Sequence, residues 1–117
     1  MYANIEHVID TILQAIAEPH RRDILRLISS TELSSGDIAA RFDVTRPAIS
    51  QHLQVLSAAG LVTVRRDGTR RLYRARPEGL AELRAFLDIF WDESLLRLKR
   101  EAEAEERRQA HDDSAAE

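Results

Sequence analysis

The sequence predicts a mainly α-helical fold with one small β-hairpin, in the order α-α-α-α-β-β-α. Three patterns predict it. Apolar residues recur at helical spacing over residues 4–17 and 80–98. A segment with one apolar and one polar face follows Thr45. Asp67-Gly68, a strong hairpin signal, separates two runs in which β-branched and charged residues alternate.

Length and composition narrow the classes of protein. A chain of 117 residues that is 44% hydrophobic and 32% charged is expected to be one soluble globular domain. It contains no cysteine, which excludes disulfides, thiolate metal sites, a cysteine nucleophile and thiol redox sensing. No run approaches the ~18 apolar residues of a membrane helix. The N-terminus lacks a basic region followed by an apolar stretch, so we expect a cytoplasmic protein.

The net charge of −3 hides a basic middle third. Residues 41–76 carry 8 arginines against 2 acidic residues, whereas residues 1–40 and 77–117 are both acidic. Such clustering of positive charge is typical of nucleic-acid-binding proteins. The alternative is an arginine-rich hairpin that forms salt bridges with the acidic C-terminal part.

The first two helices meet at a proline. Residues 4–17 carry a broad apolar face, and Glu18-Pro19 interrupts it. Pro19 is expected to start the second helix, because a proline in the first turn has no helical hydrogen bond to lose. His20 is expected to be a surface or capping residue near this helix start, with a metal ligand or proton acceptor as the alternative.

A short third helix and a polar-faced fourth helix follow. Ser34 is a plausible N-cap for a helix that ends near Phe42, and Thr45 is a good N-cap for the next helix. In that next helix one apolar stripe is opposed by a polar, almost uncharged face. The stripe holds Ile49, Leu53 and Leu56, and the polar face holds Pro47, Ser50, Gln51 and Gln54.

The polar face predicts a recognition helix. Ser and Gln can hydrogen-bond base edges in the major groove of DNA, whereas ordinary exposed helix faces are rich in Lys and Glu. A short helix, a tight turn at Asp43-Val44 and a polar-faced helix form the helix-turn-helix pattern. His52 lies beside the apolar stripe. For this residue a phosphate or intersubunit contact and a partly buried packing role are open alternatives.

Residues 61–75 are predicted to form a wing. Residues 61–66 and 69–75 read as two strands joined at Asp67-Gly68. Four arginines flank this turn, and a guanidinium pairs well with phosphate oxygens. They are Arg65, Arg66, Arg70 and Arg71. Edge-strand charges that block aggregation are the alternative.

The last helix is predicted to start at Pro77-Glu78 and to carry a long apolar band up to residue 98. Residues 99–108 are charged all round, and residues 109–117 are expected to be a disordered tail outside a domain over residues 1–108. The apolar surface of the first and last helices exceeds what a monomer of this size covers, which predicts a two-fold dimer. The expected interface residues are Ile9, Ile12, Phe86, Phe90 and Trp91. A monomer core containing the aromatic residues is the alternative.

Three runs in order resemble the ArsR family of bacterial winged helix-turn-helix repressors: IAEPHRRDIL at residues 16–25, SQHLQVLSAAGLV at 50–62 and RRDGTRRLY at 65–73. The resemblance implies a dimeric winged helix-turn-helix protein that represses transcription by occupying an operator. Many members bind metals through cysteines at the start of the third helix, where this chain has Ser34 and Gly36. Others use an Asp-x-His pair on the last helix, where this chain has Asp88-Ile89-Phe90. We therefore expect no metal or other cofactor, and whether a small effector binds stays open.

Together these patterns predict a sequence-specific DNA-binding transcriptional regulator, most simply a repressor that acts as a homodimer on a palindromic operator. A winged helix used for protein–protein contact is the alternative. No nucleophile–base spacing or phosphate-binding loop indicates an enzyme. The expected partners are double-stranded DNA and a second copy of the chain, with no membrane contact. The expected DNA-binding residues are Thr45, Arg46, Ser50, Gln51, His52, Gln54, Arg65, Arg66, Arg70 and Arg71.

Overall fold

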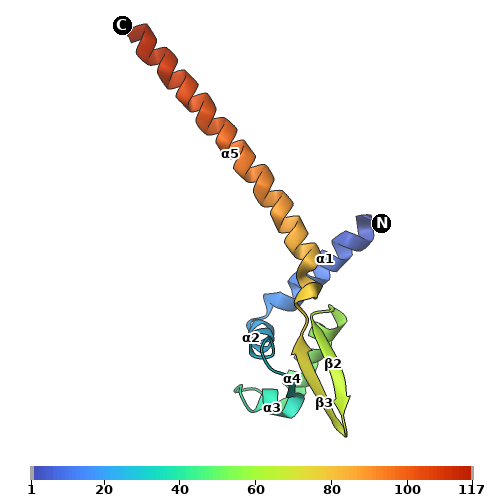
Figure 1. Cartoon of the computed structure of the whole chain (residues 1–117). Coiled ribbons are helices and arrows are strands. Elements are labelled where there is room, and N and C mark those ends of the chain that lie inside the picture. The colour runs from blue at the N-terminus through green and yellow to red at the C-terminus, as the bar shows by residue number, and fades with distance from the viewer. Residues whose placement is uncertain (1, 117) are drawn as a thin grey trace. The chain divides into compact units, whose positions relative to one another are not determined.

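The computed structural model describes the backbone of residues 2–116 and the side chains of residues 6–115 (Figure 1). The chain forms two compact units, one that ends at Leu83 and one that begins at Arg84. No helix among the described residues is both long and apolar enough to cross a membrane.

The first unit contains the predicted helices and hairpin, and one strand that the sequence did not reveal. Its elements are α1 (Tyr2–Ala17), α2 (Pro19–Leu27), β1 (Leu33–Ser34), α3 (Ser35–Ala39), α4 (Arg46–Ala58), β2 (Val62–Asp67), β3 (Arg70–Ala75) and the 3-10 helix η1 (Pro77–Leu80), followed by the first turn of α5 (Ala81–Ala116). The three strands form an antiparallel sheet in the order β1-β3-β2. This arrangement confirms the mainly helical winged helix-turn-helix fold, with β1 as an addition to the hairpin.

Side-chain caps fix where three of the helices begin. The Thr45 hydroxyl accepts a hydrogen bond from the Ala48 backbone N–H at 3.3 Å, and α4 starts at the next residue. The Ser34 hydroxyl caps α3 in the same way. The Glu18 carboxylate caps α2 by accepting from the Arg21 backbone N–H at 3.1 Å. Such caps satisfy N–H groups that a helix leaves unpaired at its start.

The hairpin turn lies one residue later than the sequence suggested. Asp67 pairs with Arg70 in the strand register, so the two-residue loop is Gly68-Thr69 instead of Asp67-Gly68. Gly68 has a φ of 66°, a conformation that glycine adopts without strain. A two-residue hairpin loop with glycine first and a positive φ only at that position matches a type II′ turn.

The core of the first unit lies between the helices and the inner side of the hairpin. Side chains from α1, α2, α3, α4 and the start of the hairpin are almost fully buried there. They are Ile12, Ile24, Ile28, Ile38, Ile49, Leu53, Leu56 and Leu61. The stripe predicted for α4 is therefore confirmed as its core-facing side.

Ile12 corrects one predicted interface residue. Its side chain is only 1% exposed and packs in the core of the first unit, so it cannot also reach a second subunit. The helical spacing of α1 gave one broad apolar face and did not separate its inward part from its outward part. The outward part includes Val8 and Leu13, which are 40% and 44% exposed, while Ile9 is partly buried against the core.

The second unit is the long continuation of α5. The structure differs here from the expected tail, because the helix runs on to Ala116 and includes residues 109–116. Ala, Glu, Arg and Gln dominate residues 100–110, and these residues favour helix. No glycine or proline occurs after Gly79 to stop the helix. The local sequence therefore favours continuation of the helix along the charged segment.

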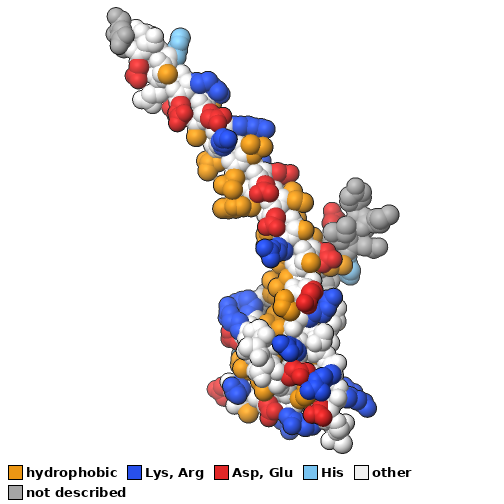
Figure 2. Space-filling view, in the orientation of Figure 1, with side chains coloured by type: hydrophobic (Ala, Val, Ile, Leu, Met, Phe, Trp, Pro, Cys, Tyr) orange, Lys and Arg blue, Asp and Glu red, His pale blue; other side chains and the backbone are white. Residues whose placement is uncertain are grey.

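Apolar side chains gather on the first half of α5, and Figure 2 shows hydrophobic side chains in orange. The exposed large apolar side chains are Phe86, Leu87, Ile89, Phe90, Trp91, Leu95, Leu96 and Leu98. Their relative exposures lie between 46% and 62%, which is high for residues of this kind. Phe86 and Phe90 stack with ring centroids 6.5 Å apart.

Candidate nucleic-acid interface

The outward face of α4 consists of polar side chains that have no packing role. Ser50, Gln51 and Gln54 are exposed, whereas Ile49 and Leu53 on the opposite side are 0% and 1% exposed. This helix therefore presents hydroxyl and amide groups outward from a rigid, buried base. Those groups are the ones that can read base edges.

Arg46, at the start of α4, lies across the start of α3. A Cβ atom built on Gly36 would come within 3.0 Å of the Arg46 Nη2 atom, so the guanidinium packs directly over this glycine. The Thr45 hydroxyl is engaged in capping α4. Of these two predicted DNA-binding residues, Arg46 is the one whose polar group extends beyond its own helix.

A polar groove runs between α3, α4 and the wing formed by β2 and β3. It brings together five of the predicted DNA-binding residues, including three arginines from two elements. Its lining is Ser34, Ser35, Gly36, Arg46, Ser50, Gln54, Thr69, Arg70, Arg71 and Tyr73. Arg65 and Arg66 lie along a second groove between the wing and α4, which Gln54 and Arg71 also line.

The four wing arginines divide between the two faces of the hairpin. Arg66 and Arg71 are directly opposed in the register, and they share a face with the pair Val64 and Tyr73. Because side chains alternate along a strand, Arg65 and Arg70 lie on the other face. The sequence pattern grouped the four arginines together, but the structure separates them into two pairs.

Arg65 and Arg70 already have carboxylate partners. The Arg65 Nε atom donates to both oxygens of Glu32, at 2.8 and 3.0 Å. This hydrogen bond raises the pKa of Arg65 further above its ordinary value. The Arg70 Nη2 atom donates to Asp37 Oδ2 at 3.0 Å.

These partners differ from the ones that the sequence suggested. The alternative reading of the basic third supposed salt bridges to the acidic C-terminal part, whereas Glu32 and Asp37 flank the start of α3 in the first unit. Arg66 and Arg71 are exposed, and neither forms an ion pair with any residue whose side chain is described. Their charge is therefore available to a ligand.

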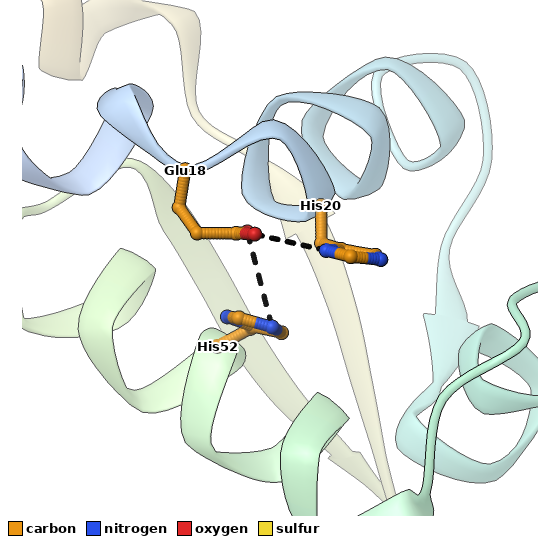
Figure 3. A group of neighbouring side chains, drawn as sticks. All are labelled: Glu18, His20 and His52. Carbon is orange, nitrogen blue, oxygen red and sulfur yellow. Dashed lines mark hydrogen bonds and ion pairs between the residues drawn. The ribbon is translucent and has the colours of Figure 1, made fainter.

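His52 points away from the polar face of α4 and toward the start of α2 (Figure 3). Its ring stacks on that of His20 with centroids 5.7 Å apart and an angle of 13° between planes. Its side chain is 18% exposed, and its Nε2 atom lies 3.9 Å from Glu18 Oε2. In the chain by itself His52 therefore has the partly buried packing role, and a contact between His52 and DNA stays a prediction.

Burial and neighbours set the charge state of this cluster. Burial is the main cause that lowers the pKa of His52, and the Glu18 carboxylate opposes the shift. The hydrogen bond from His20, at 2.9 Å, is the main cause that lowers the pKa of Glu18. The Arg21 Nη1 atom lies 3.3 Å from His52 Nδ1, the other nitrogen of the ring.

The same cluster holds the candidate metal donors among the described side chains. Glu18, His20 and His52 each offer one ligand atom, and the three atoms lie within 4.8 Å of one another. Because the two histidines are 32 positions apart, the sequence carried no local signal of this arrangement.

Comparison with known proteins agrees with this geometry. A family model described as a helix-turn-helix domain matches residues 16–65. The chain is 46% identical over 86 residues to the HTH-type transcriptional regulator Rv2034 of Mycobacterium tuberculosis, covering 74% of this chain and 80% of that protein. It is 35% identical to an arsenical resistance operon repressor of Staphylococcus xylosus, covering 69% of this chain and 78% of the repressor.

One solved structure bears on the fold and on assembly. It is the homodimeric winged helix-turn-helix DNA-binding domain Mb0332 from Mycobacterium bovis, described as a possible ArsR-family transcriptional regulator. The similarity has a TM-score of 0.64 at 33% identity, and it covers 80% of this chain and 87% of that domain.

Proposed function

The chain belongs to the ArsR family of winged helix-turn-helix transcriptional regulators, and from this premise we propose that it represses transcription as a homodimer bound to a palindromic operator. It is a DNA-binding regulator, as its family and its helix-turn-helix indicate. Regulation of this kind is a non-enzymatic role, and we expect the chain to catalyse no reaction.

One observation carries the proposal. The uncharged polar face of α4, with Ser50, Gln51 and Gln54, borders a groove that also contains Arg46 and Arg71. Short side chains that form hydrogen bonds can read the base edges, and cations can bind the phosphates of the DNA backbone. Both kinds of group occur side by side here, so α4 would read bases while the arginines hold the backbone.

The phosphate contacts would be shared unequally among the arginines. Arg66 and Arg71 carry unpaired charge and would bind phosphate directly. Arg65 and Arg70 would first have to leave Glu32 and Asp37, so we propose that they mainly position the wing against α3. Thr45 and Arg46 would anchor the start of α4 to the DNA backbone.

The homodimer would form through the exposed apolar surfaces of α1 and α5. Phe86, Phe90 and Trp91 are at least half exposed, and α1 adds Val8 and Leu13. Large exposed apolar side chains on one helix, as on α5, are typical of an interaction site. The related domain from Mycobacterium bovis is homodimeric, which supports the same assembly here. Residues 1–108 would then act as one DNA-binding and dimerisation domain.

Selection of DNA fragments by the purified protein tests the proposal. We expect enrichment of a two-fold symmetric sequence whose half-sites lie about one helical turn apart, ~34–36 Å. Placed between a promoter and a reporter, this sequence should lower expression when the protein is present. If no sequence is enriched and DNA affinity does not depend on salt, the chain is instead a winged helix used for protein–protein contact.

A further inference from the structure

We propose that Glu18, His20 and His52 form a binding site for one divalent transition-metal ion such as Zn²⁺, between α2 and the recognition helix. Glu18 is the N-cap of α2, His20 lies in the first turn of α2, and His52 lies in the middle of α4. The site is separate from the DNA-facing grooves, and the proposal does not depend on repression or dimerisation.

The donor set fits a transition metal. Two imidazole nitrogens and one carboxylate oxygen suit Zn²⁺, Co²⁺ and Ni²⁺, whereas Mg²⁺ and Ca²⁺ prefer oxygen ligands alone. In three-ligand zinc sites of this composition, water takes the fourth position. Glu18 and His20 have side chains that are 31% and 45% exposed, which leaves the open side accessible to solvent.

The distances require only small side-chain movements. Glu18 lies 2.9 Å from His20 Nδ1 and 3.9 Å from His52 Nε2, measured from its two oxygens, and no two of the three ligand atoms are more than 4.8 Å apart. Ligands about 2.0–2.1 Å from a tetrahedral ion lie roughly 3.4 Å from each other. Rotation of the partly exposed Glu18 and His20 side chains brings the atoms to this spacing, because both can move without disturbing the core.

Metal binding and the contact between Arg21 and His52 exclude each other. Its guanidinium can only donate, so the 3.3 Å approach to His52 Nδ1 assigns the ring hydrogen to Nε2, which faces Glu18. A metal ion on Nε2 would leave the hydrogen on Nδ1, where two donors would then face each other. Metal binding therefore breaks the contact between Arg21 and His52.

This exchange links α4 to the end of α1. Arg21 also donates from Nε to the Ala15 carbonyl at 2.6 Å and from Nη2 to the Gln14 carbonyl at 3.1 Å. Without metal, α4 contacts the start of α2 through Arg21, and Arg21 in turn bonds to the end of α1. With metal, α4 would be joined to α2 through Glu18 and His20 instead, and Arg21 would keep only its bonds to α1.

Cobalt binding to the full-length, chelator-treated protein tests the site. The chain has four histidines, and two of them, His7 and His111, lie outside the site as exposed internal controls. We expect one Co²⁺ per chain, displaced by Zn²⁺. The ring protons of His20 and His52 should shift or broaden in NMR spectra at substoichiometric cobalt, while those of His7 and His111 should not.

Two variants and a matched control complete the test. His20→Ala and Glu18→Gln should each weaken cobalt binding at least tenfold, and His111→Ala should leave it unchanged. Glu18→Gln keeps an oxygen that can cap α2, and the melting temperature of each variant without metal checks the fold. Unchanged binding in His20→Ala, equal effects on all four histidines, or no binding at millimolar cobalt would overturn the proposal.

Discussion

At the scale of single residues, Gln51 offers the sharpest test of base reading. Its side chain is exposed on the polar face of α4, so Gln51→Ala should leave the fold intact. If the amide reads a base, discrimination at one position in each half-site should fall by about 1–3 kcal/mol. Competition among single-base variants of the selected operator measures this loss.

The control for Gln51 is another exposed glutamine. Gln14→Ala on α1 removes the same chemical group from outside the proposed interface. It should change neither the base preference nor the affinity. Non-specific affinity should also stay constant in Gln51→Ala, because the phosphate contacts remain. A preference profile identical to that of the unchanged protein would mean that the reading face of α4 has been assigned wrongly.

His52 predicts a pH dependence of stability with a definite sign. Its pKa is lowered in the folded state, so between this value and the ordinary value of 6.5 the unfolded chain binds more protons. The free energy of unfolding should therefore be highest above pH 6.5 and decline as the pH falls through the folded pKa. Urea unfolding at a series of pH values measures the decline.

His52→Gln isolates this contribution, because glutamine has a similar size and does not titrate. In this variant, the decline in the free energy of unfolding that begins below pH 6.5 should be absent. Loss of stability through Glu18 should remain, since its lowered pKa acts below the ordinary value of 4.5. Parallel stability curves for the variant and the unchanged protein would contradict the assignment.

At the scale of elements, the wing predicts that its arginines are not equivalent. Each phosphate neutralised by a cation contributes about 0.9 to the slope of log affinity against log salt. Replacing Arg66 and Arg71 together by Ala should therefore flatten the slope and weaken binding to all sequences alike. Titrations at several salt concentrations measure the slope.

Arg65→Ala with Arg70→Ala is the matched control, since it removes the same charge from the other face of the hairpin. Both residues already pair with carboxylates, so this variant should change the salt slope less. Equal flattening in the two double variants would show that the ion pairs open when DNA binds.

The elements also show which features a sequence reveals. Thr45 and the stripe Ile49, Leu53 and Leu56 could be predicted, because capping and helical periodicity act over a few residues. The strand β1 could not, because two residues are too few for alternation. The pair formed by Glu32 and Arg65 joins positions 33 residues apart, and no local pattern records such a contact.

At the scale of the whole molecule, the apolar surface of α5 predicts a dimer. Sedimentation at micromolar concentration should give about twice the chain mass of 13.3 kDa. Phe90→Glu with Trp91→Glu would place charges in the interface and should shift the equilibrium to monomer. Glu103→Lys, a charge change at an exposed position on the same helix, is the control. A monomer that still binds a palindromic site tightly would contradict this assembly.

Helical spacing predicted the apolar surfaces but not their division between core and exterior. Ile12 and Leu13 are neighbours on α1, yet one is 1% and the other 44% exposed. This difference depends on how α1 packs against the other elements, which spacing along one helix does not specify. For the same reason, the sequence did not reveal that the rings of His20 and His52 stack.

The carboxylates beside the wing have a consequence for the search of a genome. An arginine that is already neutralised by Glu32 or Asp37 adds little to the attraction for arbitrary DNA. The protein should therefore stay a shorter time at each wrong position than its count of arginines suggests. A chromosome offers about a million or more competing positions. Weaker non-specific binding to these positions therefore leaves more molecules free to occupy the operator.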